Sequence, residues 1–173
     1  MLDQKGEHAR IMANFEQVCS VAGLQAKYMY ESMKLYCDTG EVDWVRTFWQ
    51  TKAQGLPGLV LVGVAKPDAR CQAICAALIR NYIDARVIPL NTVLDMCKDG
   101  DLVNPTVLII PNLFVEFVGK NIPAWKTQIL YDLLLHRSVH NKPSVVYVQS
   151  IEGLTKSYGQ PFSDFLTSFK QIP

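Results

Sequence analysis

The amino-acid sequence predicts an α/β protein in which a parallel sheet is covered by helices on both faces, a three-layer arrangement. Short and wholly apolar segments such as 59–62 and 107–110 are typical of strands buried on both faces. Amphipathic segments with helical spacing alternate with these runs, which is the element order of a parallel sheet. The chain has 173 residues, 49% of them hydrophobic, and is long enough to bury one sizeable core.

The N-terminal part of the chain has a helical pattern. Apolar side chains recur at helical spacing over residues 7–37, and Gly23 divides this stretch into two predicted helices. Asp43 is a suitable N-cap for a third short helix over 44–50. We therefore expect helices and no strands in this part.

A break follows at Gly55-Leu-Pro-Gly58, where glycine and proline interrupt the helical pattern. We place a domain boundary there, with an N-terminal helical segment over 1–54 and an α/β domain over 55–173. Beyond the boundary, apolar runs alternate with amphipathic stretches. We expect strands at 58–63, 86–90, 106–110 and 144–149, and helices at 67–84, 92–98 and 123–140.

Composition narrows the classes of protein and ligand. The 17 basic and 16 acidic residues give a net charge of +1, which does not favour nucleic acid or an anionic membrane. The apolar runs are far shorter than the roughly 18 residues of a membrane helix, and the N-terminus does not resemble a signal peptide. Five cysteines in apolar contexts indicate reduced thiols and a cytoplasmic protein. His136 and His140 lack a third ligand, so we expect no metal site.

One glycine-initiated loop lies where P-loop proteins bind phosphates with the motif G-x-x-x-x-G-K-[ST]. The chain has Gly63-Val-Ala-Lys66-Pro-Asp68-Ala69-Arg70 at this place. Asp68 replaces the second glycine, Ala69 the lysine and Arg70 the hydroxyl residue, and Lys66 does not have the spacing that the mechanism uses. Asp68 also brings a carboxylate to the position of a phosphate. We therefore expect a structural turn that binds no nucleotide and no other cofactor.

The order and spacing of the elements, from about Thr47 to Phe169, resemble those of the bacterial replicative-helicase loaders, the DnaC-type AAA+ ATPases. The related ATP-binding subunits of insertion-sequence transposition have a similar pattern. The resemblance rests on four stretches. They are the strand before the Walker A loop (58–63), the second strand with its helix (84–94), the Walker B strand with the loop after it (107–116), and the sensor strand with the helix that leads to it (136–150). It implies a P-loop-like AAA+ core with strand order 1-4-3-2. We expect no fifth strand and no C-terminal lid, so that the N-terminal helices cover the first strand's edge.

The catalytic residues of that family do not carry over to this chain. Walker B needs an Asp for Mg²⁺ and an acidic neighbour for water, and those positions are Pro111 and Asn112. Gln149 stands where the family has its sensor Asn. No arginine occurs in 160–173, and Glu116 alone stands where the family often has an acid. The resemblance therefore implies a degenerate AAA+ domain that is not an enzyme.

The loop after the third predicted strand is the candidate partner-binding surface. Phe114, Glu116 and Phe117 lie at the carboxyl end of a strand, where α/β folds bind their ligands. We expect these aromatic side chains to be exposed and to contact a protein partner.

The resulting hypothesis is a non-catalytic AAA+-like replication accessory protein, encoded by a phage or mobile element. It would bind a replicative helicase, a helicase loader or another AAA+ partner, as an ATP-independent loader or as an inhibitor, and a homo-oligomer stays open. Two alternatives also stay open. One is an unorthodox NTPase that uses Lys66, Arg70 and Glu116. The other is a single-stranded-DNA-binding accessory that uses the N-terminal aromatic residues, although their packing in a core or a protein interface is favoured.

Overall fold

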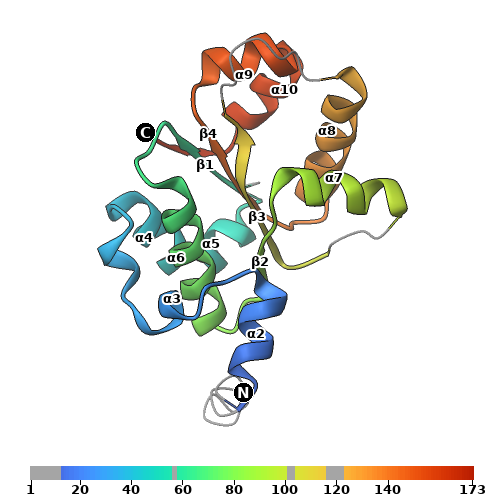
Figure 1. Cartoon of the computed structure of the whole chain (residues 1–173). Coiled ribbons are helices and arrows are strands. Elements are labelled where there is room, and N and C mark those ends of the chain that lie inside the picture. The colour runs from blue at the N-terminus through green and yellow to red at the C-terminus, as the bar shows by residue number, and fades with distance from the viewer. Residues whose placement is uncertain (1–12, 56–57, 101–103, 116–122) are drawn as a thin grey trace.

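A parallel sheet of five strands lies between two layers of helices in the computed structural model, which describes residues 13–55, 58–100, 104–115 and 123–173 (Figure 1). The strands are β1 (Gly58–Val62), β2 (Ala85–Val87), β3 (Val107–Phe114), β4 (Ser144–Val148) and β5 (Lys170–Ile172). The helices are α2 (Phe15–Ala22), α3 (Lys27–Tyr30), the 3-10 helix η1 (Met33–Leu35), α4 (Thr39–Arg46), α5 (Phe48–Ala53), α6 (Pro67–Arg80), α7 (Leu90–Asp99), α8 (Ala124–Val139), α9 (Ile151–Tyr158) and α10 (Gln160–Thr167). The predicted fold class is confirmed.

The strand order is β2-β3-β4-β1-β5, and each neighbouring pair is parallel. The predicted order of the first four strands is confirmed. The expectation that a fifth strand is missing is wrong, because β5 pairs with β1 from Leu59–Lys170 to Leu61–Ile172. This strand has three residues, and only Ile172 is buried. So short a stretch has no apolar pattern that a sequence-based prediction could detect.

Successive residues of each central strand face opposite layers, as in any strand. Leu59 and Leu61 of β1 belong to a core cluster with α6 and the N-terminal helices. Val60, between them, belongs to a second cluster with α7, α8, α9 and α10. All three side chains are fully buried. The apolar runs of the sequence are therefore strands covered on both faces, as predicted.

Gly58 begins β1 at a point where no side chain fits. Its φ is 156°, and a Cβ there would lie 1.9 Å from the backbone oxygen of Ser144 on β4. A side chain would overlap backbone atoms of the neighbouring strand, which cannot move without breaking the ladder. The glycine that ends the Gly55–Gly58 break is thus required by the sheet.

The N-terminal helices pack around α6 rather than over the edge of β1. α3, η1 and α4 each contact α6, and α2 contacts β2. The expected cover of the β1 edge is therefore wrong, because β5 occupies that edge. The division of the chain at residue 55 stays a prediction.

The start of α4 also differs from the sequence-based expectation. The predicted N-cap, Asp43, lies inside α4, and the N-cap is Asp38. Asp38 accepts a hydrogen bond from the backbone of Glu41, and the Glu41 side chain accepts one from the backbone of Asp38. This reciprocal capping box satisfies two backbone N–H groups, whereas a cap in one direction satisfies one. The helix therefore begins after Asp38, ahead of the predicted start at Asp43.

Among the described residues, no helix combines the length and the apolar character that crossing a membrane requires.

Candidate functional site

The carboxyl ends of β1, β3 and β4 meet at one edge of the sheet. The backbone N–H of Gly63 donates to Val148 O at 2.9 Å, and that of Gln149 donates to Phe114 O at 2.9 Å. Gly63, Gln149 and the Pro111–Asn112 pair therefore belong to one region, as the resemblance implies. This is the part of a parallel α/β fold where ligands usually bind.

The loop from β1 to α6 makes a tight turn. Gly63 has a φ of 62°, and a Cβ there would lie 3.3 Å from Gln149 O. Lys66 has a φ of 52°, which is unusual for a residue other than glycine, and its side chain is exposed. Pro67 begins α6, and Asp68 lies in its first turn, as predicted. The carboxylate is favourable there because it faces the positive end of the helix.

Ala69 stands at the position of the motif's lysine. It is half-buried and packs against the first core cluster. A methyl group in contact with the core can neither neutralise a phosphate nor donate a hydrogen bond to one. The position therefore serves packing.

Arg70, at the position of the motif's hydroxyl residue, binds three groups of the protein itself. Its Nη1 donates to Glu41 Oε1, its Nη2 to Asp38 Oδ2 at 2.8 Å, and its Nε to Ala65 O at 3.1 Å. The Arg70 side chain is 12% exposed, and the Glu41 side chain is fully buried. Burial by itself lowers the pKa of Arg70, but the hydrogen bonds to Glu41 and Asp38 outweigh it and raise that pKa. The guanidinium is thus a charged partner of two carboxylates.

Sequence-based prediction does not identify Asp38 and Glu41 as parts of this site. Their D-x-x-E spacing was the available signal, since it is typical of a capping box at a helix start. The spacing predicts the cap but not the arginine about thirty residues further along the chain. Only the docking of α4 beside α6 brings the three side chains together.

Pro111 and Asn112 lie in a bulge of β3. Between the pairs Ile110–Val146 and Phe114–Val148, β3 takes four steps where β4 takes two. Pro111 has no N–H to donate to a ladder, and such residues are typical of bulges. The Walker B position is thereby displaced from the regular strand.

Two long-range hydrogen bonds stabilise this bulge. Asn112 Oδ1 accepts from the backbone N–H of Leu90 at 2.9 Å and so satisfies the first N–H of α7. The hydroxyl of Tyr158 donates to Leu113 O at 2.7 Å, and burial raises the pKa of that hydroxyl. Asn112 therefore acts as a helix cap from a neighbouring strand, because its amide oxygen replaces the missing partner of α7.

Gln149 directly follows β4, as expected for the sensor position, and its side chain is exposed. Its backbone N–H, through the bond to Phe114 O, closes the end of the β3–β4 ladder.

The expectation that Phe114 is exposed is wrong. Phe114 is the last residue of β3, is only 5% exposed, and packs edge-on against Tyr158 with 6.2 Å between ring centroids. The bulge extends β3 to this residue, so the ring lies in the second core cluster. Glu116 and Phe117 lie outside the described residues.

The N-terminal aromatic residues divide into two groups. Trp44, Phe48 and Tyr28 are buried in the first core cluster, so the favoured packing role is confirmed for them. Tyr30 and Trp49 are exposed on the outer side of this segment. Because they are buried, Trp44, Phe48 and Tyr28 do not form a continuous surface on which bases could stack.

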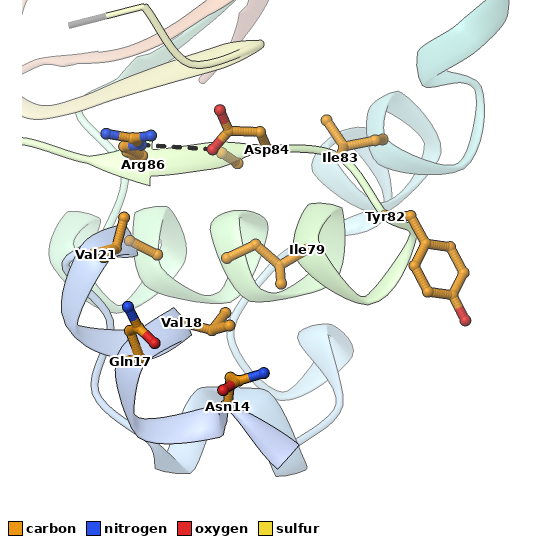
Figure 2. A pocket seen from close by; sticks show the side chains of 11 residues that line it. Asn14, Gln17, Val18, Val21, Ile79, Tyr82, Ile83, Asp84 and Arg86 are labelled. Atoms are coloured by element: carbon orange, nitrogen blue, oxygen red, sulfur yellow. Dashed lines mark hydrogen bonds and ion pairs between the residues drawn. The ribbon is translucent and has the colours of Figure 1, made fainter. Parts of the chain in front are cut away.

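Within the part of the chain that the structure describes, no three His, Cys, Asp or Glu side chains are placed to hold a metal ion. A groove of about 380 Å³ lies elsewhere, between α2, the end of α6 and β2 (Figure 2). Val18, Val21 and Ile79 give it an apolar lining, and Asp84 pairs with Arg86 at 3.5 Å beside it. This groove shares no residue with the candidate site.

No protein-family profile matches the chain, and no curated protein matches it in sequence. Among solved structures, the crystal structure of the DnaC helicase loader matches with a TM-score of 0.63 at 14% identity, covering 85% of this chain and 99% of that one. The crystal structure of a DNA replication initiation factor matches with a TM-score of 0.61 at 8% identity, covering 86% of this chain and 50% of that one. At these identities the likeness shows the fold. The chain has the fold of the DnaC helicase loader, as its sequence pattern predicts.

Proposed function

We propose that the chain is a non-catalytic AAA+-like replication accessory protein that binds a replicative helicase, a helicase loader or another AAA+ partner. One observation carries the proposal: Arg70, at the hydroxyl position of the phosphate-loop motif, is engaged by Asp38 and Glu41. The fold supports a replication context, because the matching structures are a helicase loader and a DNA replication initiation factor.

The chemistry of the site argues against an ATP cycle. In P-loop enzymes a lysine neutralises the transferred phosphate, a hydroxyl holds Mg²⁺ and an Asp completes the metal site. This chain has Ala69, Arg70 and Pro111–Asn112 at those positions. A guanidinium repels Mg²⁺, and the Asn112 oxygen already accepts from Leu90 N. The protein is therefore expected to act stoichiometrically, by occupying a surface of its partner.

Nucleotide binding provides the first test. We expect titration calorimetry with ATP·Mg²⁺ to give no heat of binding and the melting temperature to stay unchanged at millimolar nucleotide. A ligand at a hundred times its dissociation constant would stabilise the fold by about 2.7 kcal/mol, which a melting curve detects easily. Saturable binding followed by phosphate release would favour the unorthodox NTPase instead.

Partner binding provides the second test. Purified replicative helicases and AAA+ loaders are titrated against the chain by interferometry, with and without ATP. We expect saturable binding to one of them that does not depend on ATP. Lys66→Asn serves as the control, because it removes the exposed cation of the loop and keeps a residue that tolerates a positive φ. Affinity only for single-stranded DNA, with a steep salt dependence, would contradict the proposal.

A further inference from the structure

We propose that Arg70, Asp38 and Glu41 form an internal lock that holds the N-terminal helical segment on the β1–α6 loop without any nucleotide. These three residues are called the Arg70 lock below. The independence from nucleotide rests on the proposed function, whereas the lock itself rests on the contacts of the three side chains.

The capping box of α4 holds the two carboxylates side by side at the start of the helix, where both accept from Arg70. Glu41 Oε2 accepts from the backbone N–H of Asp38 at 3.0 Å, and the other oxygen, Oε1, accepts from Arg70 Nη1. Asp38 accepts from Arg70 Nη2 at 2.8 Å. The guanidinium is thus held between the N-cap and the third residue of the helix, so it recognises the folded start of α4 and not an isolated acid.

The Arg70 lock differs from the other ion pairs of the described chain in range, and its Arg70–Glu41 pair differs from them in burial as well. Those pairs join residues two to four positions apart, and their side chains are at least 36% exposed. Arg70 binds acids 32 and 29 positions away, and Glu41 is fully buried. Exposed local pairs contribute little, whereas removing one partner of a buried pair leaves an uncompensated charge in the core. Loss of Arg70 therefore favours separation of α4 from α6, which returns Glu41 to water.

Further contacts of Arg70 and α4 show what the lock holds together. Arg70 Nε donates to Ala65 O, which joins the guanidinium to the β1–α6 loop. Gly40, between the two acids, lies so close to β5 that a Cβ would stand 2.4 Å from Ile172 Cδ1. Lys170 Nζ donates to Gly40 O at 3.4 Å. The first turn of α4 therefore docks on the loop, α6 and β5 together.

Cys37 reports this docking directly. It immediately precedes the lock, is 7% exposed, and its Sγ lies 3.8 Å from Arg70 O. Burial, with a smaller effect of the Glu41 charge, raises the pKa of the Cys37 thiol to about 12, so the docked thiol is protonated and unreactive. Undocking restores its reactivity. Cys75, which is fully buried on α6, serves as the internal control for unfolding.

The test is labelling with N-ethylmaleimide at pH 8, followed cysteine by cysteine by mass spectrometry. In the wild type, Cys37 should react slowly and at the same rate with and without ATP·Mg²⁺. In Arg70→Met, Cys37 should react at least about tenfold faster while Cys75 stays protected. Arg46→Met is the matched control, since it removes the exposed pair to Asp43 on the same helix and should leave the rate unchanged.

Unchanged Cys37 labelling in a folded Arg70→Met variant overturns the lock. ATP·Mg²⁺ could alter the rate of Cys37 labelling in the wild type while Cys37 still reacts faster in Arg70→Met. In that case the lock stands and the proposed nucleotide-free function fails. If circular dichroism shows that Arg70→Met does not fold, Glu41→Gln decides the matter, because it removes the buried charge that pairs with Arg70 and keeps the shape of the side chain. A faster reaction of Cys37 in Glu41→Gln supports the lock, and an unchanged rate overturns it.

Discussion

At the scale of single residues, Arg70 and Phe114 have roles that their neighbours in space determine. Arg70 follows a glycine loop, a position where a cation suggests anion binding, yet its anions are two carboxylates of the same chain. Phe114 is the last residue of an apolar strand, a position where an aromatic ring suggests a contact surface, yet the ring is buried against Tyr158. The contact made by each side chain, and not its type, distinguishes a binding residue from a structural one.

Phe114→Ala should therefore destabilise the fold rather than weaken binding. Truncating a buried Phe removes its transfer free energy and leaves a cavity, a cost of about 3–5 kcal/mol. Urea unfolding followed by circular dichroism measures the loss. Val115→Ala is the comparison, because Val115 is the next residue and is 38% exposed, so its change should stay within about 0.5 kcal/mol. A stable Phe114→Ala variant would mean that the ring does not lie in the core.

At the scale of elements, the bulge of β3 connects Asn112 to the start of α7. The bulge turns Asn112 out of the ladder, and its side chain then caps a helix that begins 22 positions earlier in the chain. An Asp in this place could still accept that hydrogen bond. The strand end therefore has a structural function that does not require a metal ion.

Asn112→Ala should cost about 1 kcal/mol of stability, because the first N–H of α7 loses its acceptor, as when an N-cap is removed. Asn91→Ala is the matched control, since Asn91 is the second residue of α7 and is exposed, and Ala has the higher helix propensity. Chemical unfolding measures both variants, and hydrogen exchange at Leu90 localises the effect. Equal stability of the two variants would contradict the capping role of Asn112.

At the scale of the whole molecule, β5 completes the first-strand side of the sheet and also contacts the start of α4. β5 pairs with β1 and so covers the edge of β1, which would otherwise be open to pairing with another chain, and the edge strand that replaces it has only three residues. Ile172 is 8% exposed and packs against Gly40 of α4. The end of the described chain is thus joined to the segment that carries the Arg70 lock.

Ile172→Asp should detach β5, because a carboxylate replaces a side chain buried among apolar groups. We expect a loss of about 2–4 kcal/mol in unfolding free energy and concentration-dependent association through the β1 edge. Unfolding curves and size-exclusion chromatography with light scattering measure the two effects. Gln171→Asp introduces the same charge at the exposed neighbouring position and should change neither. A monomeric Ile172→Asp variant of wild-type stability would show that β5 does not protect the sheet.

The sequence by itself determined the layer architecture, the four strands β1 to β4 and the residue types at the loop. These follow from local patterns: apolar runs such as 59–62 and 107–110, helical spacing over 67–80, and the replacement of a motif's glycine and lysine by Asp68 and Ala69. Each pattern lies within one stretch of chain, so sequence alone is enough to predict it.

Only the tertiary structure decided the partners of Arg70, the burial of Phe114, the capping by Asn112 and the presence of β5. Each depends on a contact between residues far apart in the chain, such as Arg70 with Glu41 or Leu59 with Lys170. A single sequence without its relatives has no local signal for such a pairing. The physical reason is that charge neutralisation, burial and strand pairing each need two parts of the chain in contact. These parts come together only when the whole chain folds.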